Sequence, residues 1–145
     1  RRFRPVQAVQ AVHGGRWRSG VMVGVVLVSH SAGLAAEAAA LARGIAGEDA
    51  PVAAAGGTAD GGLGTSLDLI EAAVRGVDRG AGVVIIPDLG SSVLTARLLE
   101  EEGRVVVADV PFVEGAIAAA VAAGAGSPLA DVLEAAEEAR AFRKL

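Results

Sequence analysis

Cysteine is absent from the 145 residues of this chain, and aromatic residues make up only 3% of them. Without cysteine the chain has no disulfide and no thiolate for catalysis or metal binding. Hydrophobic residues still account for 52% of the sequence, so Val, Leu, Ile and Ala must fill the core. Only two histidines are present, too few for a histidine-rich metal site. We therefore expect no metal ion and no cofactor.

Long hydrophobic runs are also missing from the sequence. A membrane-spanning helix needs roughly 20 consecutive apolar residues. The alanine-rich segment 116–123 is followed at once by Gly124 and then by Gly126. We therefore expect a soluble, cytoplasmic protein that does not associate with a membrane.

Negative charge is missing from the start of the chain and concentrated in the rest. No acidic residue precedes Glu37, whereas from Met22 onward 17 acidic residues accompany eight basic ones, a net charge of −9. A surface this acidic repels the phosphate backbone of a nucleic acid. We therefore expect no nucleic-acid partner, and the charge weakly favours a basic protein partner.

Residues 1–21 contain five arginines, and their hydrophobic residues follow no clear period. We interpret them as a basic tail, either disordered or an upstream extension before a natural start at Met22. The alternative is a secretory signal, with Arg16 and Arg18 as its charged region and residues 22–28 as its apolar one. We favour the tail because the apolar run is short and ends in Ser-His-Ser. Residues 22–145 then form one domain with one core.

Four short hydrophobic runs alternate with segments of helical period. Strands are predicted at residues 23–28, 52–54, 83–86 and 105–107. Helices are predicted at residues 32–43, from Thr65 or Ser66 to about 77, at 93–102, at 112–123 and at 128–140. In the first helix Leu34, Ala38 and Leu41 share one face.

This alternation predicts an α/β fold with an open, mainly parallel sheet and helices on both faces. We expect the strand order 2-1-3-4, in which the first and third strands are neighbours and the chain reverses direction between them. Ligands bind at the carboxyl ends of such strands. His30 follows the first strand and Asp88 the third, so the two side chains should face each other there.

A histidine beside a carboxylate suits phosphoryl transfer. A carboxylate that accepts one ring N–H fixes the tautomer and leaves the other nitrogen with a free lone pair for attack on phosphorus. We therefore interpret His30 as the phosphoryl-accepting nucleophile and Asp88 as the residue that orients it. Simpler interpretations stay open: His30 is also suited to capping a helix or bonding a neighbouring loop, and Asp88 to a turn or an N-cap.

Residues 55–66 hold five glycines in twelve positions and must form a loop. The loop lacks the Gly-Lys-Ser/Thr ending of a nucleotide-binding P-loop and the dinucleotide fingerprint spacing. We expect either a plain surface loop or a flexible wall that approaches a phosphoryl group or a partner protein. Its candidate groups are the backbone of Gly56 and Gly57 and the hydroxyls of Thr58, Thr65 and Ser66. Three serines at helix starts beside the site are further candidates to contact a phosphoryl group, namely Ser31, Ser91 and Ser92.

Several motifs together resemble one family. They are Val-Val-Leu-Val-Ser-His-Ser at 25–31, the alanines and double glycine of 53–58, Gly-Gly-Leu-Gly-Thr-Ser at 61–66, Asp-Leu-Gly-Ser at 88–91, and residues 113–116. In this order they resemble DhaM, the phosphotransfer subunit of phosphoenolpyruvate-dependent dihydroxyacetone kinase, over about residues 22–139. The resemblance implies the fold of the mannose-type IIA domain of the sugar phosphotransferase system, and a homodimer.

The resemblance also implies a reaction. His30 would receive a phosphoryl group from the carrier protein HPr and pass it to ADP held on the subunit DhaL, and the ATP formed would phosphorylate dihydroxyacetone on DhaK. Two alternatives remain. One is a IIA domain of a mannose-type sugar transporter that donates to a IIB domain. The other is a non-catalytic regulatory module of the same fold, in which His30 is merely structural.

Overall fold

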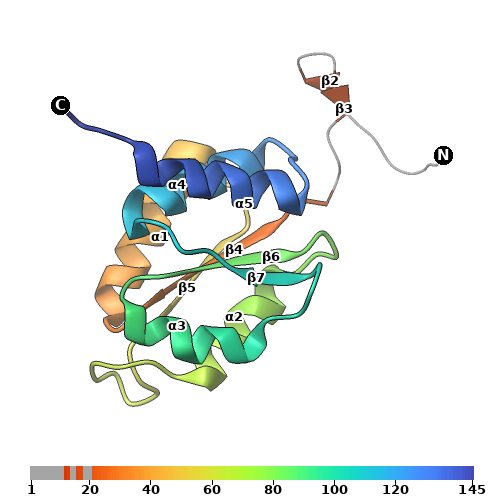
Figure 1. Ribbon diagram of the computed structural model, residues 1–145. Helices are drawn as coiled ribbons and strands as arrows, with labels where there is room; N and C mark the ends of the chain where they lie inside the picture. Colours follow the sequence, from red (N-terminus) through yellow and green to blue (C-terminus); the bar gives the residue numbers. More distant parts are fainter. Residues whose placement is uncertain (1–11, 14–15, 18–20) are drawn as a thin grey trace.

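The computed structural model describes residues 12–13, 16–17 and 21–145 (Figure 1). Its main sheet consists of β4 (Gly24–Ser29), β5 (Val52–Gly56), β6 (Val83–Pro87) and β7 (Val105–Val107). The helices are α1 (Ala32–Ala46), α2 (Leu67–Val77), α3 (Gly90–Ala96), α4 (Phe112–Gly124) and α5 (Leu129–Glu138). Short 3₁₀ turns, Arg97–Leu99 and Ala139–Ala141, extend α3 and α5.

The four main strands are all parallel, in the order β5-β4-β6-β7. This confirms the predicted order 2-1-3-4. All six residues of the central strand β4 are buried, which fits a strand covered on both faces. The carboxyl ends of β4 and β6 are level, since Val28 lies opposite Pro87. Residues just after these two strands therefore meet at one edge of the sheet.

Helices cover both faces of the sheet (Figure 1). Alternate residues of β4 point to opposite faces: Val25 and Leu27 pack with α1, α4 and α5, while Val26 and Val28 pack with α2 and α3. Alanine supplies much of the first of these layers. Small side chains allow its helices to approach the sheet closely, so the chain builds a core with few aromatic rings.

The hydrophobic face of the first helix is only partly buried. Ala38 is buried, but Leu34 and Leu41 are exposed by 46% and 47%. Buried instead are alanines, namely Ala35, Ala38, Ala39 and Ala42. The helix lies against both the sheet and α4, and this crowded side accepts only small side chains. The larger leucines are therefore turned outward.

Helix boundaries also differ from the prediction. The third helix begins at Gly90, three positions before the predicted 93, and its last turn tightens into the 3₁₀ segment Arg97–Leu99. The earlier start follows from Leu89, whose extended backbone forms the N-cap. The helix consequently begins two residues after Asp88 and brings its first serines to the sheet edge.

Two short strands, β2 (Val12–His13) and β3 (Arg16–Trp17), pair antiparallel near the start of the chain. The other residues of the predicted tail, apart from Val21, lie outside the described residues, so its disorder stays a prediction. Across the described part of the chain, every helix is too short or too polar to cross a bilayer.

Candidate functional site

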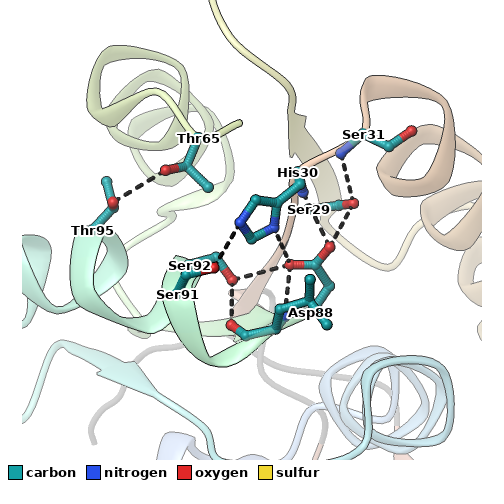
Figure 2. A network of polar contacts seen from close by, with 9 residues as sticks. Ser29, His30, Ser31, Thr65, Asp88, Ser91, Ser92 and Thr95 are labelled. Carbon is teal, nitrogen blue, oxygen red and sulfur yellow. Dashed lines mark hydrogen bonds and ion pairs between the residues drawn. The ribbon is translucent and has the colours of Figure 1, made fainter. Parts of the chain in front are cut away.

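His30 and Asp88 meet at the carboxyl edge of the sheet, as predicted. β4 delivers Ser29 and His30, and β6 delivers Asp88. The backbone is tied across this edge as well, because the N–H of Asp88 donates to the carbonyl of Val28 at 2.9 Å. Figure 2 shows the two side chains pointing toward each other, with the serines of α3 alongside.

The imidazole of His30 is held at both nitrogens. Its Nδ1 lies 3.1 Å from Asp88 Oδ1, and its Nε2 lies 2.8 Å from the hydroxyl of Ser91. An ionised carboxylate only accepts hydrogen bonds, so Nδ1 carries the proton. In the neutral ring Nε2 then has a lone pair and accepts from Ser91. The side chain of His30 is 28% exposed, which makes the ring accessible at the protein surface.

The Asp88 carboxylate is surrounded by donors, and only 8% of the side chain is exposed. Oδ2 accepts from the backbone N–H of His30 at 3.0 Å and from the hydroxyl of Ser29 at 2.9 Å. Oδ1 accepts from the His30 ring, from the N–H of Leu89 at 2.7 Å and from the hydroxyl of Ser92 at 3.0 Å.

These donors outweigh the effect of burial on the carboxylate. Burial alone raises the pKa of Asp88, but the hydrogen bonds from His30, Ser29 and Leu89 together hold this pKa below its ordinary value. Asp88 is therefore ionised at neutral pH. A fixed negative charge on the Nδ1 side favours the tautomer whose Nε2 is free of a proton.

Two buried serines belong to this network without having been predicted as partners of Asp88. Ser29 and Ser92 are both fully buried. Ser29 donates its hydroxyl to the carboxylate, whereas the single hydroxyl hydrogen of Ser92 is shared between the carboxylate at 3.0 Å and the carbonyl of Leu89 at 2.8 Å. The sequence suggested Ser92 as a contact for a phosphoryl group. Its hydroxyl is buried and cannot reach one. The strand register carried a usable signal: Val28 lies opposite Pro87, so Ser29 and Asp88 are the next pair along.

Ser31 caps α1 rather than pointing at the ring. Its hydroxyl accepts from the N–H of Leu34 at 3.1 Å. Gly56 makes this turn possible, because a Cβ at that position would collide with the Ser31 carbonyl and lie 2.8 Å from the Cα of Ala32. Glycine at the end of β5 thus allows the start of α1 to approach closely.

The glycine loop supports the histidine segment through its backbone. Gly57 donates to the carbonyl of Ser29 at 3.0 Å, and Gly64 donates to the carbonyl of His30 at 2.9 Å. The N–H of Thr58 bonds the carbonyl of Gly62, and its hydroxyl bonds Asp60. Gly57 and Thr58 are therefore engaged within the protein in this structure, and their contact with a phosphoryl group stays a prediction.

The remaining loop hydroxyls also have partners away from the ring. Thr65 pairs with Thr95 of α3 at 3.1 Å, apart from the network around His30 (Figure 2). Ser66 caps α2 by accepting from Leu69. Within the described residues, no group of three or more His, Asp or Glu side chains could hold a metal ion.

The chemistry available at this edge is nucleophilic. The ring presents a nitrogen with a lone pair at the surface, and a buried carboxylate holds the proton on the opposite nitrogen. As the first nitrogen forms a bond, positive charge develops on the ring, and the carboxylate stabilises it.

Comparisons with known proteins agree with this chemistry. Residues 24–133 match the EIIA-man family, described as the PTS system fructose IIA component. Two phosphoryl donor subunits DhaM of phosphoenolpyruvate-dependent dihydroxyacetone kinases from Listeria innocua are similar. That of kinase 2 is 33% identical over 69% of this chain and 85% of its own length. That of kinase 1 is 35% identical over 67% and 78%, respectively.

A solved structure is similar as well. The crystal structure of EF1359, a protein of unknown function, superposes with a TM-score of 0.71 at 31% identity, over 81% of this chain and 95% of the other. The order of strands and helices described above is thus shared with an experimentally determined fold.

Proposed function

The chain belongs to the EIIA-man family, among the phosphoryl donor subunits of phosphoenolpyruvate-dependent dihydroxyacetone kinase, and we propose that it carries the phosphoryl group on Nε2 of His30. The donor in this proposal is HPr, and the acceptor is ADP bound on DhaL. The ATP so formed phosphorylates dihydroxyacetone on DhaK. The observation that carries the proposal is the partly exposed His30 ring, which is tethered to Asp88 at Nδ1 and bonded at Nε2 to the rotatable hydroxyl of Ser91.

The transfer exchanges one phosphorus–nitrogen bond for another. The Nε2 lone pair attacks phosphorus on the donor histidine in line, the bond from phosphorus to the donor nitrogen breaks, and the electron pair of that bond returns to the donor ring. The proton on Nδ1 stays between the ring and Asp88, whose charge offsets the positive charge that the ring gains. In the second step ADP attacks the same phosphorus, and the His30 ring becomes neutral again.

Ser91 has two places in this scheme. Its hydroxyl donates to Nε2 at rest, and it must turn away when phosphorus approaches that lone pair. A hydroxyl this close can then donate to a phosphoryl oxygen. The start of α1 adds backbone donors, because the N–H groups of Ala32 and Gly33 have no intrahelical acceptor. Together these groups offset the negative charge on the phosphoryl oxygens.

The family description favours one alternative acceptor. EIIA-man is described as a PTS system fructose IIA component, so a IIB domain of a mannose-type transporter is the second candidate. The remaining features of the proposal are a homodimer and action in the cytoplasm, without nucleic acid or membrane. The family resemblance supports the dimer, and sedimentation velocity tests it. The acidic charge of the chain supports the lack of a nucleic-acid partner.

The decisive experiment follows the phosphoryl group from donor to acceptor. Purified chain is labelled with enzyme I, HPr and radioactive phosphoenolpyruvate, freed of donor, and then mixed with DhaL and ADP or with a IIB domain. Label that appears in ATP supports the dihydroxyacetone kinase, and label on the IIB domain supports the transporter. If the chain never labels while HPr does, the proposal is wrong.

A further inference from the structure

Ser29 precedes the histidine in the chain and is fully buried, and its hydroxyl joins two elements. It donates to Asp88 Oδ2 at 2.9 Å and accepts from the backbone N–H of Ser31 at 3.0 Å. A hydroxyl has one hydrogen, so Ser29 donates to the carboxylate and acts on the ring only through it. We infer that Ser29 is a positioning residue, which orients Asp88 and thereby keeps the proton of His30 on Nδ1. The inference deepens the proposed function and rests on it.

The first step of the argument concerns the direction of the Ser29 O–H bond. A serine hydroxyl rotates freely unless its lone pairs are occupied. The N–H of Ser31 is fixed by the first turn of α1, and it occupies one lone pair of Ser29. The hydroxyl hydrogen is thereby directed to Asp88. The start of α1 is thus linked to the carboxylate through a single buried oxygen.

The second step concerns the carboxylate plane. Oδ2 accepts from two donors, the Ser29 hydroxyl and the backbone N–H of His30. These two donors on Oδ2, together with the N–H of Leu89 on Oδ1, fix the rotation of the carboxylate so that Oδ1 faces Nδ1 of the ring at 3.1 Å. Without the hydroxyl, Oδ2 keeps only the backbone N–H of His30. The orientation of the carboxylate toward the ring then depends on that one bond and on the donors that remain on Oδ1.

The third step concerns the tautomer. A carboxylate that faces Nδ1 favours the ring with the proton there, and only that ring has a lone pair at Nε2. Ser91 does not enforce this choice, because a hydroxyl can donate to a bare nitrogen or accept from a protonated one. The choice therefore depends on Asp88, and through Asp88 on Ser29.

Three serine variants separate this role from simple packing. Ser29→Ala removes the hydroxyl, and Ser29→Cys fills nearly the same space with a group that donates weakly. Ser66→Ala is the matched control, since it also removes a serine that accepts from a helix N–H, but at α2 and away from Asp88. Circular dichroism and thermal unfolding identify the temperature at which all variants are folded.

Two measurements are made on each folded variant. Nitrogen-15 NMR of the ring reports the tautomer, and the signals of His30 are assigned by their loss in His30→Ala. Single-turnover transfer from phosphorylated HPr reports the rate. We expect Ser29→Ala and Ser29→Cys to show a mixed tautomer and a rate reduced about tenfold, while Ser66→Ala matches the parent in both.

Two results would overturn the inference. One is a Ser29→Ala variant with the parent tautomer and a rate within twofold of the parent. The other is a Ser29→Cys variant that behaves as the parent does, because the side chain would then only fill space. The NMR measurement needs no phosphoryl donor, so it tests the effect of Ser29 on the tautomer whether or not the parent can be labelled. A parent that fails to label counts against the proposed function, and not against the role of Ser29 in setting the tautomer.

Discussion

Asp88→Asn changes the charge at the site while keeping nearly the same shape. The carboxylate accepts backbone N–H groups on both of its oxygens, from His30 on Oδ2 and from Leu89 on Oδ1. An amide has one accepting oxygen and one donating NH₂ group. Either orientation of the introduced amide therefore places an NH₂ group against one backbone N–H.

The two orientations differ in their effect on the ring. With NH₂ in the place of Oδ2, it opposes the N–H of His30 and the hydroxyl of Ser29 loses its acceptor. With NH₂ in the place of Oδ1, it donates to Nδ1 of His30 and forces the proton onto Nε2, which removes the nucleophilic lone pair. A partly buried donor left without an acceptor costs about 1 to 3 kcal/mol. Loss of the charge and of the correct tautomer should slow transfer by about 100-fold or more.

The assay is single-turnover transfer from phosphorylated HPr, with urea unfolding on the same samples. Asp109→Asn is the matched control, because Asp109 also follows a strand of the main sheet, is exposed, and lies outside the network around the ring. We expect the control to transfer at the parent rate. Should Asp88→Asn transfer within twofold of the parent while folded, the pairing of Asp88 with the histidine has no part in the reaction.

Three further predictions concern the same site. Gly56→Ala should destabilise the protein by about 1 to 3 kcal/mol in urea unfolding and slow transfer, because the new methyl group collides with the start of α1. Gly76→Ala is the control: a methyl group there enters open space within α2, so it should stabilise the protein by about 1 kcal/mol. Ser91→Ala should slow single-turnover transfer about tenfold without changing the ring tautomer in NMR; an unchanged rate would remove Ser91 from the mechanism. The stability from Asp88, whose folded pKa is lowered, should be fully present above its unfolded pKa of about 3.9 and lost as the pH falls through the lower folded pKa. The urea stabilities of the parent and Asp88→Asn should therefore converge only at acid pH, below about 3.9.

Much of the fold follows from the period of the hydrophobic residues. The buried runs that became β4 and β6 are short and rich in Val and Ile, and glycine, proline or polar residues end them clearly. The alternation with helices then restricts the topology to a few choices. Prediction was weaker for α1, because its leucines dominate the hydrophobic pattern. The packing space next to the sheet and α4 admits only alanine, and the pattern alone does not contain that information.

The centre of the site was predictable because it depends on topology. Once the first and third strands are neighbours, the residues that follow them must meet, and this placed His30 with Asp88. The rest depends on local hydrogen bonds. Gly57 and Thr58 are engaged within the protein because the loop folds back on itself, and a list of polar residues does not reveal which partners they choose. The bond from Ser29 to Asp88 could not be predicted without knowing the register between β4 and β6.

The central claim is tested most directly by locating the phosphoryl group on the ring. Phosphorus–nitrogen coupling is measured by NMR on nitrogen-15-labelled chain after transfer from HPr, with His30→Ala and His13→Ala prepared in parallel. We predict coupling to Nε2 of His30, none in His30→Ala and an unchanged signal in His13→Ala. A phosphoryl group on Nδ1, on a serine or in His30→Ala would contradict the account.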